Sequence, residues 1–514
     1  MARSKKTYAP GPRSKVAAPP ADLAVASRCG QVSASSLSRP VLLGIILCIW
    51  LAAFLRIWGA MDEFWMDEIW SLLLFAGRAN SPLDIMTAHH DNNHYLVTLW
   101  MYLLGQNQSN WTLYRIPSLV AGIGTIILAA RFSFRWGSVA TVAATVLTSA
   151  SYVLICFASE ARGYALAGFF ALAALLALDR FLTTRSVVAN ILFAATTILG
   201  TLSHLTFVEV YFALCTWSCA VCWQQSKTRA KALRQLVGLH AVPIVAMAVL
   251  YIIDIRAMKI GGGDTRTIED VVISTLALTA GALTTNMFLQ LSLGGLVFVA
   301  AIVAIVLLAR AGSTLWLFFA SGIFFAPMLL LTLHPPELIY ERYFYVNLVL
   351  LLVLLSYLFS RLWELRPAGP IAVVAALALF VAANGWQTFD FLRVGRGHFR
   401  EALELMLESD PDQKEIHIAN DGHRSRPVLY TQFYGRYVAG HTFVFDDLGP
   451  RLKKFPEWMI IATGEQPYSD SRDLRFEGGN GYYRIQQVFP YAGISGFTIA
   501  VYRWQDEANA RPGP

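Results

Sequence analysis

The sequence places two acidic pairs close together after its first long apolar run. Asp62-Glu63 and Asp67-Glu68 are five residues apart. Five residues turn a helix by about 140°, so we expect only one pair to face a given pocket. A carboxylate beside a second acidic group suits a general base that removes the proton of a weakly acidic hydroxyl. Charges solvated at a surface are the alternative interpretation of both pairs.

Further polar groups recur at the ends of later apolar runs. An arginine in such a place can hold a phosphate strongly, because water is scarce there. Snorkelling toward lipid headgroups is the alternative for any one of them. Glu160 and Arg162 are two residues apart, so on a helix they face different partners. The residues singled out are Asn93, His94, Arg115, Glu160, Arg162, Tyr164, His204, Arg342 and Tyr343.

The elements that must position these residues are apolar helices. Hydrophobic residues make up 56% of the 514-residue chain and charged residues 15%, against about 25% charged in soluble domains. This composition excludes an ordinary soluble globular protein and predicts a polytopic α-helical membrane protein with about eleven crossings. The apolar runs are 41–58, 116–130, 138–157, 163–178, 187–203, 205–223, 236–253, 288–309, 313–333, 343–360 and 369–385. Residues 271–287 are a further span or a re-entrant segment.

The placement of positive charge predicts the orientation. The net charge is +7, and residues 1–40 hold seven basic residues against one acid, Asp22. By the positive-inside rule this segment is a disordered cytoplasmic tail, and nothing in it indicates nucleic-acid binding. The first apolar run is a retained anchor rather than a cleaved signal peptide. We therefore expect a multi-pass protein of the inner or plasma membrane, in contact with membrane lipids.

The odd number of crossings leaves the C-terminus on the extracytoplasmic side. Residues 41–387 form the membrane domain, and 60–114 its first extracytoplasmic loop, with interfacial helices rich in tryptophan. Residues 388–505 change in composition and predict a small extracytoplasmic α+β domain, in which 427–434 is a strand or a short helix. Residues 506–514 are a disordered tail.

Taken in order, several motifs of the chain resemble the GT-C superfamily of membrane glycosyltransferases. The nearest likeness is to the bacterial branch related to protein O-mannosyltransferases and lipid A sugar transferases. The resemblance covers about residues 41–385 and is carried by Trp65-Met66-Asp67-Glu68, Asp91 to Leu99, Leu113 to Leu119, Ser159 to Leu166, His204 and Arg342-Tyr343. Tyr95 departs from the pattern, because relatives often have proline after the motif histidine.

The resemblance implies transfer of a sugar from a polyprenyl-phosphate donor to a hydroxyl of a lipid, glycan or protein acceptor, with inversion at the anomeric carbon. Asp67 is then the general base, and Glu68 assists it. His94, Asn93 and His204 contact donor or acceptor, or in some relatives a divalent metal. The donor and its phosphate are assigned to Arg162, Arg342, Glu160, Tyr164, Tyr343 and Arg115.

Two other classes of protein remain open. A transporter or flippase of lipid-linked saccharides usually places ionisable residues near the bilayer midplane and has two related halves. Here the candidate residues gather at one face, and no repeat is evident. A membrane scaffold with a recognition domain at 388–505 is the third interpretation.

Overall fold

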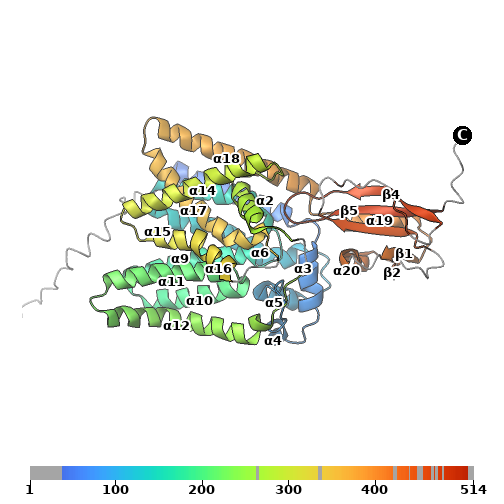
Figure 1. The fold of residues 1–514 in the computed structure, drawn as a ribbon, viewed down its shortest axis with the longest axis horizontal. Helices are drawn as coiled ribbons and strands as arrows, with labels where there is room; N and C mark the ends of the chain where they lie inside the picture. Colours follow the sequence, from blue (N-terminus) through green and yellow to red (C-terminus); the bar gives the residue numbers. More distant parts are fainter. Residues whose placement is uncertain are drawn as a thin grey trace, which may run out of the picture.

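The computed structural model describes residues 37–261, 265–333, 338–420, 425–438, 440–447, 455–464, 468, 473–476 and 480–506. Nearly all of the predicted N-terminal tail, 1–40, and of the predicted C-terminal tail, 506–514, lies outside these residues. The described chain forms a long helical bundle with a small sheet domain at one end (Figure 1).

Apolar helices make up the bundle. The described residues contain eight helices that are long and apolar enough to cross a membrane, or nine if the bent pair α7 (Ser138–Ala150) and α8 (Tyr152–Ala158) is one span. The eight are α2 (Arg39–Gly59), α6 (Thr112–Ser133), α9 (Tyr164–Thr184), α12 (Arg229–Ile253), α14 (Met287–Arg310), the continuous helix Leu315–Leu333 (α15, η4 and α16), α17 (Tyr345–Trp363) and α18 (Ala368–Val394).

All eleven predicted apolar runs coincide with helices. The two not yet named are α10 (Val187–Ser203) and α11 (Phe207–Gln225), which are not among the eight. The predicted extra segment 271–287 is not a span, because its helix α13 (Ile268–Thr279) has only 12 residues. About 20 residues are needed to cross a hydrocarbon core of ~30 Å.

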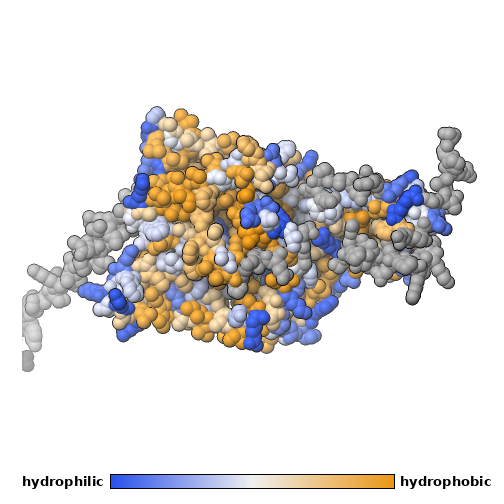
Figure 2. Space-filling view, in the orientation of Figure 1, coloured by the Kyte–Doolittle hydropathy of each residue, from blue (hydrophilic) through white to orange (hydrophobic). Residues whose placement is uncertain are grey.

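The outer surface of the bundle is apolar. Large side chains such as Leu47, Trp50, Val245, Leu296 and Leu379 are exposed. Figure 2 shows this apolar surface along the bundle, with hydrophilic residues toward its ends and on the sheet domain. At the centre, α17 is buried on nearly all sides. Such a surface is consistent with a polytopic membrane protein, since soluble proteins rarely expose large contiguous apolar patches.

Arg56 stabilises the bend between α7 and α8, whose axes differ in direction by 57°. A helix end leaves its last carbonyl groups without intrahelical partners. The fully buried Arg56 guanidinium donates to the carbonyls of Thr148 at 2.9 Å and Ser149 at 3.3 Å. At the start of α8, the Tyr152 N–H donates to Asn384 Oδ1 at 3.0 Å. Backbone groups on both sides of the bend therefore have hydrogen-bond partners. The segment 159–163 follows α8 directly.

The first loop, 60–114, folds against the end of the bundle that faces the sheet domain (Figure 1). Its elements are α3 (Met66–Trp70), the π-helix η1 (Ser71–Ala76), α4 (Pro82–Ile85) and α5 (Tyr95–Leu104). Trp65, one of the tryptophans of the loop that was predicted to be interfacial, is buried, and its ring packs 5.9 Å from that of Phe497 in the sheet domain. The reason is that the sheet domain covers this part of the loop.

The sheet domain begins later than predicted. Residues 388–394 continue α18, which ends where Gly395 adopts a φ of 78°, so the boundary lies at Gly395 rather than at residue 388. Two helices follow, α19 (Phe399–Ser409) and α20 (Ser425–Tyr434). Of the two alternatives for 427–434, the helix is confirmed.

The five strands form one sheet in the order β2-β1-β3-β5-β4. Strand β1 pairs in parallel with β2 and β3, whereas β5 pairs antiparallel with β3 and β4. Their bounds are β1 (Glu415–Asn420), β2 (Thr442–Asp447), β3 (Trp458–Thr463), β4 (Gly481–Phe489) and β5 (Thr498–Asp506). The prediction of a small α+β domain is thus confirmed.

Candidate functional site

A cavity of about 280 Å³ lies beside α3, where the first loop meets the ends of several helices. Its walls come from α3, from the segment before α5, from the start of α9, and from the segments after α10 and before α17. Eight of the eleven predicted site residues line it. They are Asp67, Asn93, His94, Arg162, Tyr164, His204, Arg342 and Tyr343.

The two oxygens of the Asp67 carboxylate differ in their hydrogen-bond partners. Oδ2 accepts from Arg162 Nη1 at 2.7 Å and lies 3.2 Å from Arg342 Nη1. No donor to Oδ1 is found among the described residues. The side chain is nearly buried, with 11% of its surface exposed. Asp67 therefore keeps one oxygen available at the cavity while two arginines hold the other.

Arg162 is positioned by the short segment between α8 and α9. Its Nη2 donates to Asn92 Oδ1 at 2.7 Å, and its carbonyl accepts from Ser118 Oγ at 2.9 Å. A Cβ on the next residue, Gly163, would lie 1.7 Å from the carbonyl oxygen of Ser203, so only glycine allows this close approach to α10. Burial disfavours the charge of Arg162, but Asp67 together with Tyr164 and Glu160 outweighs it, so the guanidinium pKa is raised.

His94 and His204 stack 5.0 Å apart, and the His204 ring lies 4.4 Å from that of Tyr164. Arg162 Nε donates to His94 Nε2 at 3.3 Å, so this nitrogen carries no proton. Burial, followed by the charge of Arg162, lowers the pKa of His94 well below its ordinary value and that of His204 to about 3. Both imidazoles are therefore neutral near pH 7.

Stability should depend on pH through these two histidines. Their folded-state pKa values lie below the unfolded value of about 6.5, so the unfolded chain binds more protons as the pH falls. We expect the free energy of unfolding to decrease from about pH 7 to about pH 5, by at most about 1.4 kcal/mol per pH unit for each histidine. Chemical unfolding in detergent over this range measures it.

The matched variant is His204→Asn, which removes one of the two titrating groups. Its stability should fall less steeply with decreasing pH than that of the wild type. Identical pH dependence of the two proteins would contradict the neutral, buried state of His204.

Three buried polar atoms of the cavity lining have no hydrogen-bond partner among the described residues. They are Asn93 Oδ1, Tyr164 Oη and Arg342 Nε. Buried polar groups are nearly always paired with protein, water or a ligand. All three atoms are buried within the wall of the cavity, so these parts of the lining side chains are not held by hydrogen bonds within the described protein.

Glu68 and Arg115 do not line the cavity but pair with one another beneath it. Both side chains are fully buried, with Arg115 Nη2 2.6 Å and Nε 2.8 Å from the Glu68 carboxylate. Glu68 Oε1 also accepts from the Ala161 N–H at 2.6 Å. Because Glu68 follows Asp67 and Ala161 precedes Arg162, this contact fixes the distance between the two cavity residues. The geometry gives Glu68 and Arg115 a positioning role.

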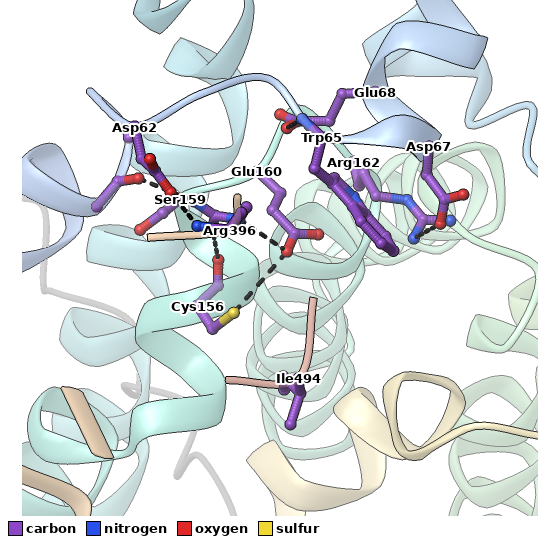
Figure 3. A network of polar contacts seen from close by, with 12 residues as sticks. Asp62, Trp65, Asp67, Glu68, Cys156, Ser159, Glu160, Arg162, Arg396 and Ile494 are labelled. Carbon is purple, nitrogen blue, oxygen red and sulfur yellow. Dashed lines mark hydrogen bonds and ion pairs between the residues drawn. The ribbon is translucent and has the colours of Figure 1, made fainter. Parts of the chain in front are cut away.

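Glu160, the third predicted residue outside the cavity lining, belongs to a buried network around Arg396 (Figure 3). Arg396 Nε lies 3.5 Å from Glu160 Oε1, and the guanidinium donates to the carbonyls of Gly59 at 3.0 Å and Cys156 at 3.1 Å. The Arg396 N–H donates to Asp62 Oδ2 at 2.7 Å. The network ties the start of the sheet domain to α2 and α8. Sequence reasoning missed Arg396, although a lone arginine between two glycines after the last span was a signal.

The sheet domain also holds the loop that carries Asp67. The Met66 N–H donates to Tyr430 Oη at 3.0 Å, and Tyr434 Oη donates to the carbonyl of Phe64 at 2.7 Å. Glu63 accepts from the N–H groups of Phe399 at 2.8 Å and Arg400 at 3.1 Å. Hence neither acidic pair is a solvated surface pair. Asp62-Glu63 packs at the domain junction, whereas Asp67 lies at the cavity and Glu68 beneath it.

Asn92, His90 and Asp91 are further cavity residues that sequence reasoning did not assign. Asp91 Oδ1 accepts from the N–H of Gly261 at 2.9 Å, which fixes the segment after α12 at the cavity edge. Their position directly before Asn93 and His94 was the available signal. In the described part of the chain, no group of three His, Cys, Asp or Glu side chains is arranged to hold a metal ion.

No protein-family model matches the chain, and no curated protein has a significantly similar sequence. The cavity combines a carboxylate oxygen that can take a proton, two arginines that can hold an anion, and two neutral imidazoles. This set can bind a phosphate ester and deprotonate a hydroxyl beside it.

Proposed function

We propose that the protein is a membrane glycosyltransferase of the GT-C type. It moves a sugar from a polyprenyl-phosphate donor to a hydroxyl of a lipid, glycan or protein acceptor. The observation that carries this proposal is the arrangement at Asp67, where Oδ1 is open to the cavity while Arg162 and Arg342 hold Oδ2. The two arginines and the other polar residues of the cavity lining support a sugar phosphate as the ligand.

The proposal includes a topology of eleven crossings, with the N-terminus cytoplasmic and the sheet domain and cavity extracytoplasmic. The turn between α11 and α12, which contains Lys227, lies at the bundle end away from the sheet domain (Figure 1). Positive residues in short loops favour the cytoplasmic side. Nucleotide sugars are absent outside the cytoplasm, which is why a lipid-linked donor fits this location.

The proposed reaction is a single displacement at the anomeric carbon. The acceptor oxygen forms the new glycosidic bond while the bond from the anomeric carbon to the phosphate oxygen breaks, and its electron pair leaves with the phosphate. Asp67 Oδ1 takes the acceptor proton. One displacement by one nucleophile inverts the configuration, through an oxocarbenium-like transition state.

Arg162 and Arg342 are proposed to stabilise the departing phosphate. Without donor, both guanidinium groups lie against Asp67 Oδ2, and the single negative charge of this carboxylate offsets only one of their two positive charges. A bound phosphate offers them more anionic oxygens, so it competes with Asp67 for the two guanidinium groups. Donor binding therefore weakens the contacts of Arg162 and Arg342 with Asp67, and the carboxylate becomes free to act as a base.

A transfer assay with purified protein tests the proposal. The protein is given radiolabelled polyprenyl-phosphate sugars of several kinds, and label is measured in lipid, glycan and peptide fractions. We expect transfer from at least one donor and none from nucleotide sugars. Movement of the donor across vesicle membranes without any transfer would instead favour the flippase interpretation. Absence of turnover with every donor, together with unchanged donor binding in Arg162→Met, would overturn the proposal.

A further inference from the structure

A second and larger cavity, of about 470 Å³, lies between α2, α7, α8 and α18. It shares no lining residue with the cavity at Asp67. Its walls are apolar apart from Cys48, Ser149, Thr388 and Arg393, and the Thr388 hydroxyl is already bonded to the carbonyl of Asn384. A cavity with such walls does not hold ordered water well, because water needs two to four polar partners.

Hydrocarbon is the medium around this cavity. Helices α2 and α18 are the least buried of the spans, with 17% of the apolar window of each buried, and α18 runs along the edge of the bundle (Figure 1). Trp50 on α2 and Trp386 on α18 are largely exposed on the same pair of helices. The contents of a cavity between two lipid-facing helices therefore come from the membrane.

The depth of the cavity matches one leaflet. Its lining extends along α2 from Cys48 to Trp58 and along α18 from Val381 to Arg393. At 1.5 Å per residue these stretches are about 15 Å and about 18 Å long. Half of a hydrocarbon core of ~30 Å is about 15 Å. A single hydrocarbon chain that enters from the membrane boundary would thus reach the end of the cavity near the bilayer midplane.

One end of the cavity is suited to a headgroup. Trp58 and Arg393 lie there, and tryptophan and arginine are typical of the boundary between hydrocarbon and headgroups. Within the described residues, the ion pair of Arg393 is with Asp390 on the same helix, and 64% of the Arg393 side chain is exposed. Such an exposed ion pair is weak, so a lipid phosphate can compete for the guanidinium.

We propose that this cavity is a binding site for one acyl chain of an anionic phospholipid, whose phosphate is held by Arg393. The lipid belongs to the leaflet on the side of the sheet domain. The site is independent of glycosyl transfer and would remain if the proposed function were wrong. It is also distinct from an annular contact, because four helices line the cavity rather than one.

Gly385 provides the test, because it lines the cavity and a Cβ added there meets no atom within 4 Å. Gly385→Phe should place a ring in the space of the acyl chain without a clash. The matched control is Gly295→Phe on α14. An added Cβ at Gly295 also meets no atom within 4 Å, but Gly295 does not line this cavity. Both variants put the same side chain on an exposed face of a membrane helix.

The probe is phosphatidylglycerol with a photoactivatable group in its acyl chain, in nanodiscs of phosphatidylcholine. We expect crosslinks on α2 and α18 in the wild type and in Gly295→Phe, and a several-fold loss in Gly385→Phe. Arg393→Gln should abolish the preference for phosphatidylglycerol over an equally labelled phosphatidylcholine. Equal crosslinking of the two phenylalanine variants would overturn the acyl site, and equal labelling of the wild type by both lipids would overturn the role of Arg393.

Discussion

Asp67→Asn is expected to abolish sugar transfer, with a loss of at least about 10²-fold in rate. The amide has nearly the same size as the carboxylate, but it cannot take the proton of the acceptor hydroxyl. It also leaves Arg162 and Arg342 without their anionic partner in the absence of donor. The rate of label transfer from the donor identified in the assay above measures the effect, and thermal unfolding in detergent checks that the variant is folded.

Asp62→Asn is the control for this prediction. Asp62 belongs to the other acidic pair and contacts Arg396 rather than the cavity. We expect it to retain most of the transfer activity. If both asparagine variants lost transfer to the same extent, the choice of Asp67 as the base would be wrong.

Glu68→Gln is expected to cost about 3–5 kcal/mol in the free energy of unfolding, as removal of one partner from a buried ion pair typically does. Arg115 is fully buried and has no access to water once its anionic partner is lost. The glutamine amide can replace only part of the hydrogen bonds that Glu68 accepts from Arg115, Ala161 and Trp65. Chemical unfolding in detergent gives the change directly.

The exposed pair Arg361–Glu364 serves as the control. Arg361→Gln should change the free energy of unfolding by no more than about 1 kcal/mol. The double variant Glu68→Leu with Arg115→Met should recover part of the loss, because it leaves no unpaired buried charge. A cost for Glu68→Gln as small as that for Arg361→Gln would be incompatible with a positioning role for the pair.

The helices were predictable because their signal is local. A run of apolar residues is long enough by itself to indicate a span, and each predicted run coincides with a helix. Residues 427–434 were ambiguous, because valine, tyrosine and phenylalanine favour strands. Tertiary packing favours the helix there: Tyr430, Phe433 and Tyr434 have the spacing of one helical face and pack on Phe64 and Phe399.

Much of the candidate site was predictable because its residues lie at the ends of apolar runs that we expected at the same face. Which of them meet could not be predicted, since the contacts join distant parts of the chain. Glu68 and Arg115 are separated by 47 residues, and Arg396 and Glu160 by 236. Burial also decides whether a residue can touch a substrate. In the sequence, the acid next to Asp67 is a candidate for catalysis, but Glu68 is fully buried and cannot contact a substrate.

The bonds from Tyr430 and Tyr434 to the segment 64–66 have a thermodynamic consequence. A chain cut after Val394 would lose every one of these bonds, together with the Glu63 carboxylate's two backbone partners. The first loop and the sheet domain should therefore unfold in a single cooperative step. The sheet domain therefore could not be replaced by that of another protein as a separate module, because its own residues hold the loop that carries Asp67.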